Sequence, residues 1–243
     1  MKRNPNITVI HPHALLVNWE AKISEQIHHR VLQLDSWVRD HLAEELLETV
    51  PTYHSLTLYL HEHINAHTFK EKLTDAFEQN RIQHKPAKSE LVTIPVCYDL
   101  EFAPDIESLA QEHKLTVEEV IQRHTAPCYR IYFLGFLPGF PYLGGLDKQL
   151  ATPRKTTPRQ RISPGSVGIA GNQTGIYTVS SPGGWNIIGR SPVQLLKQDA
   201  EHPTVLTPGD YLKFEAIEAD VFKDIEAEVK AGAYRFTKTT YHD

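Results

Sequence analysis

The sequence predicts two parts of different fold class: a small α+β domain over residues 1–85, followed by a mainly-β barrel over residues 86–243. Three observations support this division. None of the 13 glycines precedes Gly135, and twelve of them lie between Gly135 and Gly209. Early in the chain, apolar residues recur every three or four positions, which is the period of a helix. In the later half, Pro-Gly pairs, which are typical of tight turns, occur four times.

Hydrophobic periodicity predicts the elements of the first part. Residues 7–19 are expected to form one or two strands, split by a turn at "HPH". A long apolar stripe then indicates a helix, and its length favours a break near residues 35–36. Residues 55–60 alternate as a strand does, and residues 67–80 place their apolar side chains on one helical face. The stripe consists of Ile23, Ile27, Val31, Leu34, Val38, Leu42 and Leu46.

The second part is expected to begin after a polar, proline-containing linker at residues 84–90. A strand, "LVTIPVCY", is followed by two short helices, and the second helix begins with a capping box, Thr116-x-x-Glu119. Residues 129–137 form a continuous apolar run, which predicts a strand buried on both faces. Further strands are predicted at "VGIAG", "GIYTVS", "WNIIG", "VQLLK" and "DYLKFEAI", punctuated by turns at Pro138-Gly139, Pro164-Gly165, Pro182-Gly183 and Pro208-Gly209.

Composition excludes several classes of protein. No apolar run reaches bilayer length, and the first residues lack the features of a secretory signal, so we expect no membrane association and a cytoplasmic location. The two cysteines, Cys97 and Cys128, are predicted to be reduced thiols in that compartment. The net charge of −5 argues against nonspecific binding of nucleic acid.

Charge is distributed unevenly along the chain. Residues 148–197 contain seven Lys or Arg residues and no Asp or Glu, so the rest of the chain has 18 positive and 30 negative residues, a balance of −12. A basic patch on an acidic protein concentrates anions at one place. The alternative is a solvated basic face whose acidic partners come from elsewhere. Because the basic run coincides with the glycine-rich region, we favour an anion-binding site.

Four segments carry the candidate site: residues 124–129, 134–146, 152–177 and 181–192. Glycines allow backbone N–H groups to approach a ligand closely. Arginine offers a planar fork that matches carboxylate or phosphate, and aromatic side chains form apolar pocket walls. Each feature alone favours a structural role. Their clustering predicts a pocket for a small anionic molecule or a phosphorylated intermediate.

Several familiar motifs are absent. The chain has no GxxxxGK[ST] phosphate loop, no GxGxxG fingerprint and no GxSxG elbow. The pairs His11/His13 and His61/His63 lack a third local ligand, so we expect exposed histidines and no metal site. His124 is the one histidine that we single out as a functional candidate, although a structural hydrogen bond is the favoured role for it.

Three segments resemble a known family. "LGFLPGFPYLGGLD", "ATPRKTTPRQRISPGSVGIAGNQTGIY" and "SPGGWNIIGRSP" are similar to the B subunit of the bacterial ATP-dependent 5-oxoprolinase. That family is also called KipI, after a histidine-kinase inhibitor, and it is related to subunit 1 of allophanate hydrolase. The resemblance includes "PTYHSLTLYL" and "IPVCYD", and it weakens over the N-terminal helix and after about residue 217.

The resemblance implies a fold and an activity. The fold would be a small α+β domain followed by a cyclophilin-like β-barrel. The chain would work with a C subunit (KipA-like) and an A subunit (LamB/YcsF-like) to open 5-oxoproline to glutamate, and it would be inactive alone. ATP, as Mg-ATP bound by this chain or by a partner, would phosphorylate the lactam oxygen before water attacks. The alternatives are an inhibitor of a sensor histidine kinase and a subunit of urea- or allophanate-related amide metabolism.

The same resemblance suggests roles for individual residues. Positive charge and fixed N–H donors would stabilise the developing oxyanions, and the general base would come from a partner subunit. The predicted catalytic residues are Arg154 and Arg190. The predicted substrate- or anion-binding residues are Arg159, Gly165, Ser166, Gly168, Gly171, Gln173, Thr174, Gly183 and Gly184. The predicted pocket or partner-interface residues are Pro138, Gly139, Phe140, Pro141, Tyr142, Trp185 and His124.

Overall fold

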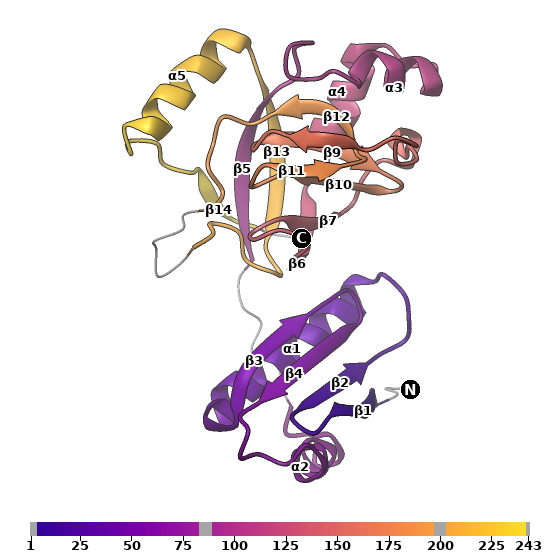
Figure 1. Ribbon diagram of the computed structural model, residues 1–243, viewed down its shortest axis with the longest axis vertical. Coiled ribbons are helices and arrows are strands. Elements are labelled where there is room, and N and C mark those ends of the chain that lie inside the picture. Colours follow the sequence, from indigo (N-terminus) through magenta and orange to yellow (C-terminus); the bar gives the residue numbers. More distant parts are fainter. Residues whose placement is uncertain (1–3, 83–88, 197–202, 242–243) are drawn as a thin grey trace. The chain divides into compact units, whose positions relative to one another are not determined.

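The computed structural model describes residues 4–82, 89–196 and 203–241 (Figure 1). The chain divides into two compact units, residues 1–87 and residues 88–243, and each unit is described by itself. Most of the predicted linker, residues 84–90, lies outside the described residues.

The first unit is one antiparallel sheet covered by two helices. Its strands are β1 (Asn6–His11), β2 (Ala14–Asn18), β3 (Leu46–Pro51) and β4 (Ser55–Leu60), in the spatial order β1-β2-β4-β3. Helix α1 (Glu25–His41) packs on β3 and β4, and α2 (Ala66–Glu78) packs on β1 and β2. The core forms because β4 alternates: Leu56, Leu58 and Leu60 are buried whereas Tyr59 is exposed. The predicted α+β class of this unit is confirmed.

The first helix is shorter than the apolar stripe predicted. Helix α1 runs unbroken past residues 35–36 and ends at His41. A single 3-10 turn, Ala43–Glu45, then reverses the chain, and Leu46 begins a strand rather than extending the helix. Ile23 lies before the helix and is half exposed. The prediction was wrong here because Leu46 continues the helical spacing by coincidence while packing against the same core from β3.

The second unit is a closed barrel of seven strands, which confirms the predicted mainly-β class. Strand β5 (Glu90–Cys97) runs parallel to β13 over seven residue pairs, and its last residue, Cys97, pairs with Arg190 at the end of β12. β5 is therefore the seam where the barrel closes, and β14 (Lys238–Thr240) adds to its other end. The remaining barrel strands are β6 (Tyr129–Leu134), β7 (Pro141–Gly144), β9 (Ser166–Ala170), β10 (Gln173–Ile176), β12 (Asn186–Arg190) and β13 (Tyr211–Ile217).

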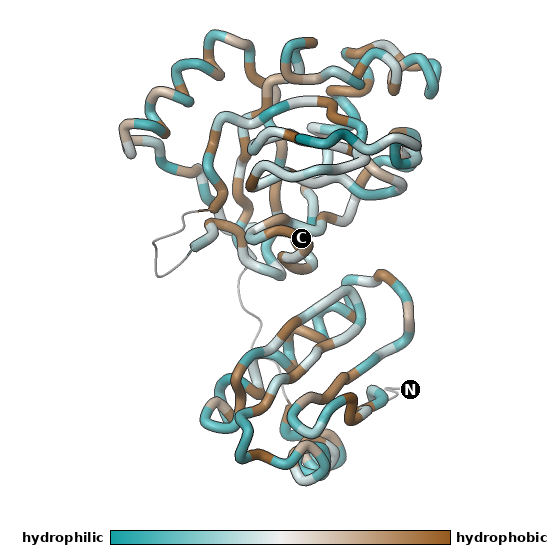
Figure 2. Tube along the Cα trace, viewed as in Figure 1, coloured by the Kyte–Doolittle hydropathy of each residue, from teal (hydrophilic) through white to brown (hydrophobic). Residues whose placement is uncertain are grey.

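Helices and a short ribbon surround the barrel. Helix α3 (Ile106–His113) contacts β12, α4 (Val117–Thr125) contacts β13, and α5 (Ala219–Lys230) contacts β5. In Figure 2, hydrophobic and hydrophilic residues intermingle along α5, as expected of a helix that buries one side. The capping box at Thr116 and Glu119 is present as predicted. A two-stranded ribbon is formed by β8 (Arg159–Ile162) and β11 (Ser181–Gly183). None of the helices in the described ranges is both long and apolar enough to cross a bilayer.

Three details of the predicted barrel are corrected. The strand expected over residues 129–137 ends at Leu134, because Phe136 adopts a left-handed conformation that turns the chain. The strand is also only partly buried, rather than buried on both faces. "VQLLK" forms no strand in its described part, where Leu196 makes an isolated bridge to Thr204. Pro182-Gly183 is not a turn but part of β11, whereas the glycines of the other three pairs have the expected positive φ: Gly139 at 72°, Gly165 at 83° and Gly209 at 98°.

The second unit has two apolar clusters. One fills the barrel interior and extends to α3 and α4. The other, which we call the outer aromatic cluster, consists of Phe140, Ile162, Ala170, Tyr177, Trp185 and Ile187. All of these residues belong to the glycine-rich region of the sequence, so the candidate site is built around this cluster.

Candidate functional site

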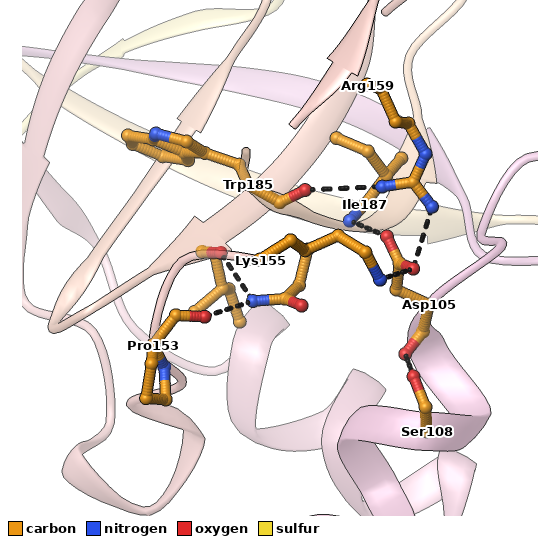
Figure 3. Close-up of polar contacts among 9 residues, drawn as sticks. Asp105, Ser108, Pro153, Lys155, Arg159, Trp185 and Ile187 are labelled. Atoms are coloured by element: carbon orange, nitrogen blue, oxygen red, sulfur yellow. Dashed lines mark hydrogen bonds and ion pairs between the residues drawn. The ribbon is translucent and has the colours of Figure 1, made fainter. Parts of the chain in front are cut away.

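Asp105 connects three segments of the second unit through one buried carboxylate (Figure 3). It precedes α3, and its side chain is only 4% exposed. Its Oδ1 accepts hydrogen bonds from Lys155 Nζ and Arg159 Nη2, both at 2.7 Å. Its Oδ2 accepts the backbone N–H of Ile187 on β12, also at 2.7 Å. The carboxylate therefore joins the start of α3, the basic segment and the barrel wall.

The charge of this site is set by the basic residues. Burial alone would raise the pKa of Asp105, but the hydrogen bonds from Arg159, Lys155 and the Ile187 N–H hold that pKa below its ordinary value. Asp105 is therefore ionised at neutral pH and fully engaged, so it is not a free base. One carboxylate with two cations leaves one net positive charge at this point.

The same contacts fix the segment that carries Arg154. Asn186 Nδ2 donates to the carbonyl of Pro153 at 2.8 Å, and the N–H of Lys155 donates to the carbonyl of Gly184 at 2.7 Å. Both neighbours of Arg154 are thus anchored, while its own side chain is exposed. Across the described ranges, Arg154 makes no hydrogen bond or ion pair. A charged fork held on a rigid backbone is suited to binding an anion from outside the barrel.

Tyr177 lies beneath this segment and was missed by the sequence analysis. The residue is 1% exposed, and its hydroxyl has no hydrogen-bond partner in the described structure. Burial raises the pKa of Tyr177 to about 12, and the charges of Arg154 and Arg159 oppose that rise. Its ring meets Phe140 and Trp185 edge to face, with centroids 5.5 and 6.2 Å away. Phe140 and Trp185 are thus packed core residues rather than open pocket walls.

Arg190 lies away from Arg154. The residues on either side of Arg154 bond to Gly184 and Asn186, at the start of β12. Arg190 is the last residue of that strand, so its backbone lies about 13 Å from that of Asn186. Arg190 Nε donates to the carbonyl of Pro164, and its guanidinium lies 5.9 Å from the ring centroid of Phe222 on α5. It lines a cavity of about 180 Å³ between α5 and the barrel. The structure does not bring the two predicted catalytic arginines into one site.

His124 on α4 and Thr174 on β10 are both fully buried and contact each other. The Thr174 hydroxyl donates its one proton to the Gly168 carbonyl oxygen, 3.2 Å away. The same hydroxyl oxygen therefore accepts a hydrogen bond from the N–H at His124 Nε2, 2.8 Å away. His124 Nδ1 then accepts from the Tyr98 hydroxyl at 2.8 Å. Burial lowers the pKa of His124 to about 3, so the imidazole is neutral. The structural hydrogen bond favoured for His124 is present, and Thr174 is sealed from any ligand outside the barrel.

Two predicted glycines are required by close contacts. A Cβ on Gly165 would lie 2.2 Å from the Ser191 carbonyl oxygen, and a Cβ on Gly183 would lie 2.4 Å from the Tyr177 hydroxyl. These glycines allow strands to pack, which accounts for them without a ligand. Among the other predicted residues, Ser166 and Gly168 are buried in β9, Gly171 forms the β9–β10 turn, Gln173 begins β10, and Gly184 accepts from Lys155.

The loop between β6 and β7 contains the remaining predicted residues. Gly139 has positive φ, Pro141 begins β7 in a buried position, and Tyr142 stacks on Phe133 with centroids 4.2 Å apart. The carbonyl of Pro138 accepts from Thr178 Oγ1 at 2.6 Å. Phe136, which the sequence analysis did not select, is the exposed aromatic residue of this loop at 65%.

Comparisons with known proteins agree on one family. Residues 5–206 match the model of the family described as "Carboxyltransferase domain, subdomain C and D". Three curated relatives match, and each is named as the B subunit of 5-oxoprolinase. The protein of that name from Bacillus subtilis is 37% identical over 84% of this chain and 89% of its own length.

Solved structures match over most of the chain. The crystal structure of TTHA0988 is 34% identical, with a TM-score of 0.75, over 85% of this chain. The match covers only 40% of TTHA0988, which is therefore a much longer protein. Urea amidolyase from Kluyveromyces lactis has a TM-score of 0.78 over 98% of this chain and 16% of its own, but at 18% identity this likeness shows the fold alone.

Proposed function

Since this chain belongs to the carboxyltransferase subdomain C and D family, and within it to the 5-oxoprolinase B-subunit proteins, we propose that it is the B subunit of a multi-subunit 5-oxoprolinase. The observation that carries the proposal is the 37% identity to a protein of that name over most of both chains. The reaction proposed is the opening of 5-oxoproline to glutamate with hydrolysis of ATP.

The exposed arginine gives this chain a chemical role in that reaction. A lactam is a stable amide, and its phosphorylation and hydrolysis place negative charge on oxygen atoms. Arg154 supports a role in binding such charge because it is unpaired within the described structure and because both its neighbours are anchored. Arg159 and Lys155 add positive potential while remaining bound to Asp105. The carboxylate of 5-oxoproline is the group we assign to Arg154.

Other components of the reaction are assigned to partner subunits. Asp105 is held by three donors and His124 is buried and neutral, so neither is suited to act as the general base. We assign the base to an A or C subunit. ATP, as Mg-ATP, would bind to a partner or at a site shared with this chain.

The test is ATP hydrolysis that depends on 5-oxoproline. The chain is mixed with its candidate A and C subunits, and each is omitted in turn. Turnover only in the complete mixture would support the proposal. No turnover, with every subunit shown to be folded, would contradict it.

Arg154→Ala is the first variant to measure. We expect it to lower kcat/KM for 5-oxoproline by roughly ten- to a hundredfold, mainly through a higher KM, because a hydrogen bond to a charged group typically contributes about 1.5–3 kcal/mol and the substrate carboxylate is charged throughout the reaction. The unfolding midpoint should not change, since the side chain is exposed. Arg235→Ala, which removes an exposed arginine near the C-terminus, is the matched control and should retain full activity. A wild-type kcat/KM for 5-oxoproline in Arg154→Ala would refute the anion-binding role.

A further inference from the structure

Phe136 is displayed on the surface in a conformation that phenylalanine disfavours. Its φ is 64°, and its side chain is 65% exposed. The N–H of Leu137 donates to the carbonyl of Gly135 at 2.8 Å, so Phe136 is the central residue of a three-residue turn with positive φ. A bulky residue in this region costs of order 1 kcal/mol. A polar residue or glycine would avoid the exposed apolar area, and glycine would also avoid the strain.

The loop around Phe136 is held firmly from within. The Gly135 N–H donates to the carbonyl of Phe140 at 3.0 Å, and the Phe140 N–H donates back to the carbonyl of Leu137 at 3.0 Å. Phe140 itself is buried in the outer aromatic cluster, and its ring meets that of Phe136 at 87° with centroids 5.7 Å apart. The exposed ring is therefore pre-organised, which lowers the entropy lost when it binds.

Neighbouring side chains extend the exposed ring into a surface. We define the Phe136 patch as Phe133, Phe136, Leu137 and Tyr142, all of which are at least partly exposed. Ring contacts make it continuous: Phe133 stacks on Tyr142, and both Tyr142 and Phe136 contact Phe140 beneath. Rigid aromatic groups of this kind dominate the energetics of protein–protein interfaces.

One exposed cation is connected to the loop of this patch through a short run of residues. Arg161 is exposed, and its Nε donates to Ser180 Oγ at 3.2 Å. Two residues before Ser180, Thr178 holds the carbonyl of Pro138 in the Phe136 loop. Arg161 and this loop therefore both contact the segment 178–180, and Arg161 belongs to a stretch, residues 148–196, that contains no Asp or Glu. A complementary surface would offer an apolar pocket for the ring and carboxylates for the arginine.

We propose that the Phe136 patch is the surface on which another subunit of the same enzyme docks, with Phe136 as the anchor in an apolar pocket rimmed by carboxylates. This inference rests on the proposed function, which requires partner subunits. A protein occupant is favoured because the matched region forms only 40% of TTHA0988, so in that relative the same fold is joined to further protein.

The test measures binding of the full chain to its candidate C-like and A-like subunits, each immobilised in turn. Phe136→Gly removes the ring and also relieves the positive φ, so the variant should be at least as stable as the wild type. We expect its affinity for the docking subunit to fall at least about thirtyfold, mainly through faster dissociation. Leu100→Ala is the matched control, because Leu100 is 58% exposed in the same unit, and its binding should be unchanged.

Arg161→Glu tests the charge of the partner. Its association rate should fall several-fold at low salt, and the difference from wild type should shrink as salt is raised. An unchanged or faster association rate for Arg161→Glu would overturn the carboxylate rim.

The outcomes separate docking from the proposed activity. If Phe136→Gly binds both candidate subunits and supports turnover like the wild type, the docking proposal is refuted while the enzyme function stands. If the wild type forms a Phe136-dependent complex that does not hydrolyse ATP with 5-oxoproline, docking stands and the proposed function fails. If the folded wild type binds neither subunit, the docking proposal is overturned.

Discussion

Asp105 shows how a single buried carboxylate can hold two cations and a barrel strand in place. Its carboxylate holds Lys155 and Arg159 and receives the Ile187 N–H, and so it keeps the backbone beside Arg154 in place. The run of cations from residue 148 was enough to select Arg154 and Arg159 from the sequence. Asp105 could not be identified from the sequence, because its partners lie 50 and 54 positions away along the chain. Phe136 could not be identified either, because its exposure depends on a backbone turn.

Removing the charge of Asp105 should destabilise the second unit. We expect Asp105→Asn to lower the free energy of unfolding by roughly 1.5–3 kcal/mol at pH 7, a range typical of hydrogen bonds to charged groups. Because the folded pKa of Asp105 lies below its ordinary value, the stabilisation is present above about pH 4 and is lost as the pH falls through the folded pKa. Urea unfolding at several pH values measures the difference from wild type.

Asp220→Asn is the control for that comparison. Asp220 is 94% exposed and pairs with Lys223 on the surface, so its loss should change the free energy of unfolding at pH 7 by less than about 1 kcal/mol. A stability difference for Asp105→Asn that stays constant down to about pH 2 would contradict the role of the ionised carboxylate.

The buried His124 should make the protein acid-sensitive. Its pKa is about 3 when folded and 6.5 when unfolded, so unfolding takes up a proton between these values and the free energy of unfolding falls as the pH drops below 6.5. His124→Gln keeps a donor and an acceptor but does not titrate. The stability advantage of wild type over this variant should shrink by about 1.4 kcal/mol per pH unit between about pH 6 and pH 4. A pH-independent difference for His124→Gln, measured by urea unfolding, would show that His124 titrates normally in the folded protein.

At the scale of elements, local signals were predictive and long-range pairings were not. The capping box at Thr116, the strand β13 and three of the four Pro-Gly turns depend on neighbouring residues, and all were predicted. Strand β3 was missed because Leu42 and Leu46 keep the helical spacing after the helix has ended. The ribbon of β8 and β11 joins residues about 20 positions apart, and its packing on Tyr177 has no local signature.

The contact between the ribbon and the outer aromatic cluster can be tested with two variants. Gly183→Ala should cost roughly 1–3 kcal/mol, because its Cβ would lie 2.4 Å from the Tyr177 hydroxyl. Tyr177→Phe should be neutral or stabilising, since that hydroxyl has no partner in the described structure. The double variant should recover part of the loss. Additive effects in a double-mutant cycle of unfolding free energies would contradict this packing.

At the scale of the whole molecule, two separate cores divide the chain. The apolar core of the first unit is formed by residues between Ile7 and Ile82, and the two apolar clusters of the second unit are formed by residues from Val92 onward. Among the described residues, none belongs to the cores of both units. The division into an α+β part and a barrel was predictable because composition changes between them. The order of strands around the barrel was not predictable, since it depends on pairings such as Leu91 with Tyr211.

The separation of the cores predicts separate responses to core mutations. Leu58→Ala, at a fully buried site of the first unit, should lower stability by about 2–5 kcal/mol. Hydrogen exchange should then accelerate in residues 4–82 and stay unchanged in the barrel strands. Ile131→Ala, at a fully buried barrel site, should produce the reverse pattern. Acceleration across both units in either variant would show that they unfold together.

The seam at β5 has a consequence for synthesis of the protein on the ribosome. The first unit is complete before β5 is made, but the partners of β5 in β12 and β13 follow only about 90 to 120 residues later. At typical elongation rates, β13 arrives roughly 6–24 s after β5. During that time an apolar strand has no permanent neighbour on either edge, and such edges promote aggregation. The nascent chain is therefore expected to need chaperone protection in this interval, and its yield should improve when slower, cooler expression weakens hydrophobic association.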